Sequence, residues 1–141
     1  MLHPAPTTPI DPATARGVLE SIHPGHIVVS FPNTSYQMHL ATGLPVRAEI
    51  GKRILGAIRV DARRVDLVDT GGKYVEPVYG RPRRVQGRVL ATNDSSRLLL
   101  VDAGMPIHLH LLDTRQRPGD FAPGDLVSCD VRDGATFTPA P

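Results

Sequence analysis

Short apolar runs separated by turn-forming clusters make up most of the chain. The runs are five to seven residues long and rich in Val, Ile and Leu, and several alternate apolar with polar positions, as in IHLHLL at 107–112. A period of two is typical of β-strands. The stretch nearest to a helical period, PATARGVLESI at 12–22, is too short and runs into β-branched residues. The pattern therefore predicts an all-β chain.

The same pattern of runs and turns occurs twice. A shift of 71 residues places residues 17–40 over residues 88–111 without a gap, and the turn sequence HPGH at 23–26 then falls over DSSR at 94–97. Each copy is expected to open as a three-stranded meander and to continue with two more strands. These further strands are GKRILGAIRV (51–60) and RRVDLV (63–68) in the first copy, and GDLVSCDV (124–131) and ATFTP (135–139) in the second.

Five short strands per copy is the strand count of a small Greek-key barrel, in which closure removes the exposed strand edges. The strand number, the spacing and the Gly-Asp-x-Val phrase at 124–127 resemble a tandem pair of OB-fold barrels. The resemblance implies two five-stranded OB-like β-barrels and favours nucleic-acid binding. The predicted organisation is a flexible Pro-rich tail (1–15), a first barrel (16–70), an ordered connector (71–83), a second barrel (84–139) and a C-terminal end (140–141).

Charge is distributed unevenly along the chain, although the formal net charge is only +2. Residues 52–97 hold eleven basic and five acidic side chains, whereas residues 1–51 hold two and three, and residues 98–141 hold three and six. A central basic block beside a mildly acidic tail favours an anionic partner more than the overall charge does.

The connector and the first residues after it, GGKYVEPVYGRPRRVQG at 71–87, lie at the centre of this basic block. Pro77 and Pro82 have no amide hydrogen to donate, which excludes a central strand and predicts an extended, partly exposed segment. Alternate side chains of an extended segment project to one side at a separation of roughly 6–7 Å. Tyrosine would stack on bases there and arginine would bind phosphate. The predicted nucleic-acid-binding residues are Lys73, Tyr74, Tyr79, Arg81, Arg83, Arg84 and Arg88.

A second interpretation assigns the connector a structural role. The tyrosines and valines of residues 74–79 would then wedge between the two barrels, or the proline-containing edge would dock a protein partner. Few aromatic residues lie on the predicted strands, where Phe31 and Tyr36 are nearly the only candidates, and this counts against a nucleic-acid platform. An exposed Tyr79 ring favours a binding site, and a buried ring favours packing.

No catalytic or metal-binding pattern is present in the sequence. His108 and His110 share one face of a predicted strand, but Gln37 stands where the first copy would match His108, and no Cys, Asp or Glu completes a ligand set. A solvent-facing histidine pair is expected. Phosphate-binding GxxxxGK[ST], GxSxG and HExxH motifs are absent from the sequence. We expect a non-enzymatic module without catalytic residues, metal or other cofactor.

The remaining sequence features concern the cellular setting. Cys129 lies in the apolar alternation LVSCDV and is expected to be a small buried thiol. The N-terminal segment lacks the basic and apolar regions of a signal peptide, and no apolar run approaches the roughly 20 residues of a membrane span. A cytoplasmic protein without membrane association is expected, with RNA, DNA or a protein as partner. The sequence predicts no particular oligomeric state.

Overall fold

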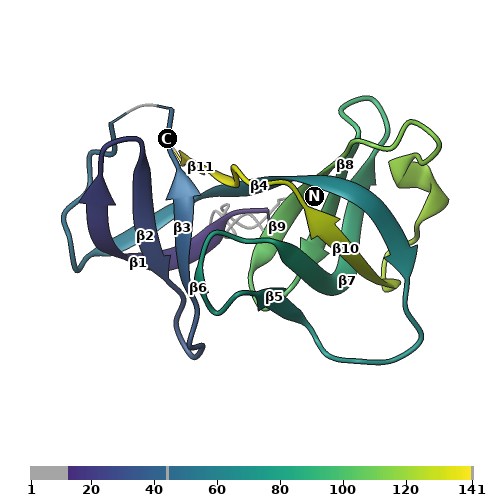
Figure 1. The fold of residues 1–141 in the computed structure, drawn as a ribbon, viewed down its shortest axis with the longest axis horizontal. Coiled ribbons are helices and arrows are strands. Elements are labelled where there is room, and N and C mark those ends of the chain that lie inside the picture. Colours follow the sequence, from purple (N-terminus) through teal and green to yellow (C-terminus); the bar gives the residue numbers. More distant parts are fainter. Residues whose placement is uncertain (1–12, 44, 141) are drawn as a thin grey trace, which may run out of the picture.

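The computed structural model describes residues 13–43 and 45–140, which form an all-β fold (Figure 1). No α-helix occurs within these two ranges, which confirms the all-β part of the predicted fold class. Residues 1–12 of the predicted tail and residue 141 lie outside the described residues. The elements are β1 (Ala15–His23), β2 (His26–Ser30), β3 (Gln37–Ala41), β4 (Arg53–Leu67), β5 (Tyr74–Glu76), β6 (Tyr79–Gly80), β7 (Arg84–Asn93), β8 (Leu98–Asp102), β9 (Pro106–Leu111), the 3-10 helix η1 (Pro118–Asp120), β10 (Leu126–Val131) and β11 (Thr136–Pro139).

The fifteen-residue strand β4 runs along the molecule and belongs to both halves (Figure 1). The sequence predicted two strands here, but the alternation continues through Asp61 and Ala62 with no glycine or proline to interrupt it. The matching segment near the C-terminus does divide, into β10 and β11. Gly134 lies between these strands with φ of 113°, a conformation that residues with a Cβ rarely adopt.

Strand pairing forms two closed circuits that share β4. In the first circuit, β1 pairs with β2, β2 with β3, β3 with β11, β11 with the first half of β4, and β4 with β1. In the second, the second half of β4 pairs with β10, β10 with β7, β7 with β8, β8 with β9, and β9 with β4. The β3–β11 and β4–β9 pairs are parallel, and the other pairs in these circuits are antiparallel.

Each circuit is completed by a strand from the other part of the sequence. Strand β11 follows the second meander in the chain, yet it pairs with β3 and with the first half of β4. The second half of β4 follows the first meander, yet it pairs with β9 and β10. Strand pairing therefore crosses the sequence boundary predicted between 16–70 and 84–139.

The two meanders share local details. The β1–β2 register shifts between Leu19 and Ser21, and the β7–β8 register shifts between Val89 and Ala91. Two residues separate β1 from β2 and six separate β2 from β3, whereas four and three residues separate the matching strands of the second meander. The first turn of the second meander is thus two residues longer and its second turn three residues shorter. Equivalent positions in the paired strands, such as Leu19 and Val89, Ser30 and Asp102, and Gln37 and Pro106, are therefore not all separated by the 71 residues of the sequence alignment.

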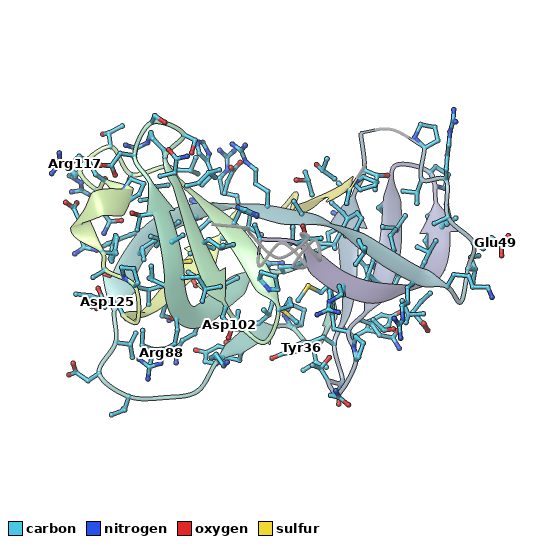
Figure 2. All side chains as sticks on the ribbon, turned by 180° about the vertical axis from the view of Figure 1, so that it is seen from behind. Tyr36, Glu49, Arg88, Asp102, Arg117 and Asp125 are labelled. Atoms are coloured by element: carbon cyan, nitrogen blue, oxygen red, sulfur yellow. The ribbon has the colours of Figure 1, made fainter. Side chains whose placement is uncertain are left out.

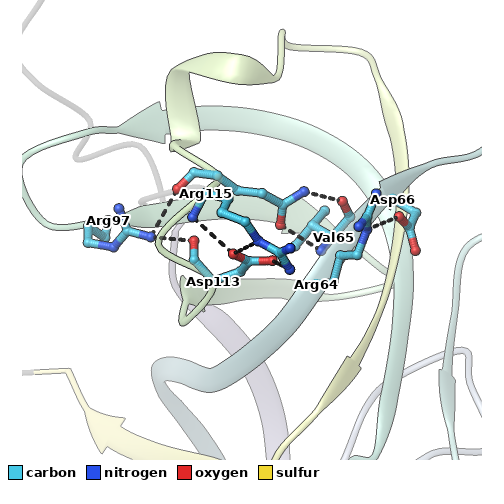
Figure 3. Close-up of polar contacts among 7 residues, drawn as sticks. Arg64, Val65, Asp66, Arg97, Asp113 and Arg115 are labelled. Carbon is cyan, nitrogen blue, oxygen red and sulfur yellow. Dashed lines mark hydrogen bonds and ion pairs between the residues drawn. The ribbon is translucent and has the colours of Figure 1, made fainter.

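A single cluster of buried residues extends through both halves. The loop that follows β9 is held against the second half by the side chains of Arg97 and Gln116. Arg97 donates hydrogen bonds to the carbonyl oxygens of Asp113 and Gln116, both at 3.0 Å (Figure 3). It also donates to the carbonyl oxygen of Leu111 at 3.2 Å. The Gln116 side chain accepts from the amide of Val65 and donates to its carbonyl, at 2.9 and 2.7 Å. The loop therefore supplies hydrogen-bond partners to the Val65 backbone on the edge of β4 opposite β10, beyond the last residue of β4 that pairs with β9.

Candidate functional site

The connector lies between the two halves and pairs with both. β5 is antiparallel to β7, and β6 is parallel to β3. The amide of Val75 also donates to the Tyr36 hydroxyl at 3.0 Å, and the amide of Gln37 donates to the Val78 carbonyl at 2.9 Å. Figure 2 shows Tyr36 between the halves, on the loop from β2 to β3. The connector is therefore an edge strand in two short pieces, with one piece on each half.

Tyr79 stands at one end of a row of aromatic rings that crosses four strands. Its ring is 64% exposed, and its centroid lies 5.0 Å from that of His39 in an edge-on arrangement. His39 stacks with His26 at 5.7 Å, and His26 stacks with His23 at 4.6 Å. We call these four residues of β6, β3, β2 and β1 the ring row. The exposure of Tyr79 favours a binding site on the connector over a role in packing the two halves together.

A hollow of about 230 Å³ lies beside the ring row. Within the part of the chain that the structure describes, the buried Nε2 atom of His39 has no hydrogen-bond partner. Burial lowers the pKa of His39 below 6.5, and the neighbouring His26, His23 and Arg81 lower it further. The imidazole is therefore neutral at pH 7. The hollow is lined by Pro24, Gly25, His26, His39, Ala41, Arg81, Gly134 and Ala135.

Arg81 links the hollow to the turn between β10 and β11. Its guanidinium lies 3.0 Å from the Asp133 carboxylate, and both side chains are more than 60% exposed. Ion pairs as exposed as this are worth about 0–1 kcal/mol, because water and salt compete for both charges. The ion pair with Asp133 therefore restrains Arg81 only weakly, and its guanidinium remains accessible to an anionic ligand that binds it more strongly.

Three of the predicted residues gather on the outer face of β5, β7 and β10. Arg84 donates to Asp130 at 2.7 Å and to the Ser128 hydroxyl at 2.8 Å. The phenol of Tyr74 and the carboxylate of Asp130 hold the pKa of Arg84 above its ordinary value. Arg88 donates to the Gly124 carbonyl at 2.9 Å and lies near Asp125 in Figure 2. The two arginines are thus committed to the protein's own acceptors.

The other two predicted cations differ in their surroundings. The Lys73 ammonium lies 2.7 Å from the Asp102 carboxylate of β8. Arg83 is exposed, and its guanidinium makes no ion pair with any other described residue, while its backbone bonds to Glu76 and Val131. The structure therefore divides the seven predicted residues. Tyr79 and Arg81 adjoin the ring row, Arg83 is exposed on the connector beside Glu76 and Val131, and Lys73, Tyr74, Arg84 and Arg88 lie on the second half.

The predicted solvent-facing histidine pair is corrected by the structure, whereas the predicted buried cysteine is confirmed. His108 and His110 share a face, but both are half-buried and bonded, His108 to the Ala13 carbonyl and His110 to the Asp61 carboxylate, each at 3.0 Å. Cys129 is buried as predicted. Burial raises the pKa of its thiol to about 12, so the reactive thiolate is scarce at neutral pH.

Three further features were sought among the described residues: a metal site, a membrane-spanning helix and a second hollow. No group of three or more His, Cys, Asp or Glu side chains in residues 13–43 and 45–140 is arranged to hold a metal ion. None of the helical structure in the same ranges is long and apolar enough to cross a membrane. A larger hollow of about 740 Å³, lined by residues that include Val46, Ile54 and Pro139, is mainly apolar.

Comparison with known proteins adds no family. No protein-family model matches the chain, and no match was found among the curated proteins. The ring row was missed by sequence reasoning, although His23, His26 and His39 are all visible in the two predicted hairpins. Their approach depends on strand register and on β6 pairing beside β3, which the hydrophobic pattern does not specify.

Proposed function

We propose that the protein is a non-enzymatic module that binds single-stranded RNA or DNA without sequence preference, through Tyr79, Arg83 and the adjoining ring row. The observation that carries the proposal is the 64% exposure of Tyr79 at the end of three stacked imidazoles. Bases of any identity stack on aromatic rings, which contributes roughly 1–3 kcal/mol per base.

The cations of the connector, which also carries Tyr79, suit the phosphates of such a strand. Arg83 has no competing carboxylate among the described residues, and Arg81 has a single exposed one, Asp133. A guanidinium can take two phosphate oxygens at once, which gives it the advantage over lysine at this task. Arg84 and Arg88, by contrast, are assigned to stability, because their hydrogen bonds join β7 to β10 and to the Gly124 turn.

The test compares a double variant with a matched control. Tyr79→Ala with Arg83→Gln removes the exposed ring and the unpaired cation, whereas Leu67→Ala with Arg63→Gln removes an equally exposed apolar side chain and a cation from β4. Binding of a fluorescent single-stranded oligonucleotide is measured at two salt concentrations. We expect at least tenfold weaker binding and a shallower salt dependence in the first variant, by about 0.7 in the log–log slope for each phosphate that is no longer neutralised.

The control variant should bind as the unaltered protein does. Equal affinity of both variants, or no salt-sensitive binding by the unaltered protein, would overturn the proposal. Thermal melting of the same samples separates a loss of binding from a loss of folding.

A protein-interaction role is the second candidate, and one observation favours it. Val78, beside Tyr79 on the connector, is an exposed apolar residue on an edge segment. Edge strands are the usual place for a partner's strand to add. Absence of oligonucleotide binding together with unchanged stability of the Tyr79→Ala, Arg83→Gln variant would favour this role.

We also propose the finer architecture, in which the two circuits are small OB-like barrels and the two meanders are copies of one unit. The matched register shifts support this, as does the presence of Gly17 and Gly87 two residues before them, where each would bring a Cβ against the backbone of the next strand. Chains of residues 16–70 and 84–139, produced separately and then mixed, test whether each unit folds only with the other.

A further inference from the structure

The hollow beside His39 has the chemistry of a ligand site. Buried polar atoms in native proteins are nearly always hydrogen bonded, yet the Nε2 atom of His39 has no partner within the described part of the chain. The volume of about 230 Å³ is several times the roughly 30 Å³ that a water molecule occupies in the liquid. The space is therefore large enough for a small polar group, and it lies against an imidazole whose Nε2 atom lacks a partner within the described part of the chain.

The charges around the hollow favour an anion. Its described lining holds one guanidinium and two imidazoles, and no carboxylate. The titratable groups that line it are His26 of β2, His39 of β3 and Arg81 of the connector, and the titratable groups in contact with these three are His23 of β1, Tyr79 of β6 and Asp133 of the turn between β10 and β11. Asp133 is the one acid in this set, and its partner is Arg81 on the exposed side.

We propose that this hollow binds a phosphoryl group, with Arg81 as the cation and His26 and His39 as hydrogen-bond donors. The three donors belong to β2, β3 and the connector and approach from different elements. A tetrahedral phosphate offers oxygens in several directions, whereas a planar carboxylate is satisfied by a single guanidinium. The phosphoryl class therefore fits this set of donors better than a carboxylate does.

The inference rests on the proposed function for the source of the phosphate, which would be the end or backbone of a strand stacked on Tyr79. The chemistry of the hollow rests on its own residues. Free inorganic phosphate is the other source, and the experiment distinguishes the two.

Occupation of the hollow would change the titration of His39. Burial lowers its pKa in the free protein, and the neighbouring His26, His23 and Arg81 lower it further. An anion favours the protonated imidazole, so the pKa of His39 should rise when phosphate binds, and phosphate should bind more tightly once the imidazole is protonated.

The first experiment follows the imidazole signals of His39 and His26 by NMR while inorganic phosphate is added. We expect saturable shifts and a higher His39 pKa at saturation. Arg81→Gln should weaken phosphate binding at least tenfold, because it removes a charge-assisted hydrogen bond. Arg132→Gln, which removes an exposed cation near the same turn but outside the lining, should change the affinity less than twofold. Equal affinity of the two variants, or shifts that never saturate, would overturn the site.

The second experiment compares 5′-phosphorylated and unphosphorylated oligonucleotides of one sequence. Tighter binding of the phosphorylated strand, abolished in Arg81→Gln, supports a nucleic-acid source. Phosphate shifts at His39 without any oligonucleotide binding would support the hollow and refute the proposed function. Oligonucleotide binding that depends on Tyr79 but leaves His39 unchanged would refute the hollow and support the function.

Discussion

The Tyr36 hydroxyl accepts a hydrogen bond from the Val75 amide at 3.0 Å, and this bond ties a loop of the first half to the connector strand on the second. Val75 is buried, with 1% of its surface exposed, so its amide has no water as an alternative partner. One phenol therefore helps to hold the two halves and the connector together.

Replacing Tyr36 by phenylalanine should lower the free energy of unfolding by roughly 1–3 kcal/mol, because it leaves a buried donor unsatisfied. Urea denaturation measures the change. Tyr79→Phe is the control, since the exposed Tyr79 ring loses only a hydroxyl and the stability should stay within about 0.5 kcal/mol. Equal effects of the two substitutions would contradict the role of the Tyr36 bond.

Stability should depend on pH through His39. The folded-state pKa lies below 6.5, so the unfolded chain binds the proton more readily. The contribution of His39 is therefore fully present above pH 6.5 and is lost as the pH falls from 6.5 through the folded-state value. Denaturation midpoints recorded from pH 8 to pH 5 should fall less steeply in His39→Gln than in the unaltered protein, and identical profiles would exclude His39 as the source.

Gly87→Ala should destabilise the protein by about 1–3 kcal/mol, as overpacking does. A Cβ at Gly87 would overlap the carbonyl oxygen and carbon of Asp102 on β8, which are backbone atoms and cannot turn aside. Gly72→Ala is the matched control, because the space around Gly72 is open and its stability should change by less than about 0.5 kcal/mol. Thermal unfolding of both variants decides the point.

Removal of β11 should loosen the first half rather than the second. A chain that ends at Asp133 lacks the strand that pairs with β3 and β4, and it loses Phe137, which is 2% exposed. Hydrogen exchange should quicken in β1, β2, β3 and the first half of β4. A chain that ends at Pro139 is the control and should exchange normally, and faster exchange concentrated in β7–β9 would contradict the pairing.

Much of the fold could be predicted because the hydrophobic alternation reports local geometry. The all-β class, both meanders and the burial of Cys129 follow from period-two patterns and turn residues. The continuity of β4 was missed, although the alternation runs on through Asp61 and Ala62, because a period of two does not report where one strand ends and the next begins. The closure of each circuit depends on pairing between strands that are distant in the sequence, such as β11 with β4 and β9 with β4. The local hydrophobic pattern carries no information on such pairing.

The candidate site shows the same limit. Tyr79 stood out because a tyrosine among prolines and arginines has no obvious core partner, and it is exposed. Arg84 looked equivalent to Arg81 in the sequence. In the structure, Arg84 bonds to Asp130 and Ser128 on the face of a sheet, whereas Arg81 lies beside Asp133 of an exposed turn. The partners of a surface arginine are set by neighbours that are distant in sequence, so composition alone overestimated the number of available cations.

The sharing of β4 has a consequence for the integrity of the chain. Residues 69–72, between β4 and β5, are exposed, and a protease cut there would separate the polypeptide into two fragments. The N-terminal fragment would keep the half of β4 that pairs with β9 and β10, and the C-terminal fragment would keep β11 and β6, which pair with β3. Each fragment thus holds a strand that the other needs, and the nicked protein would remain one particle, a heterodimer encoded in a single polypeptide.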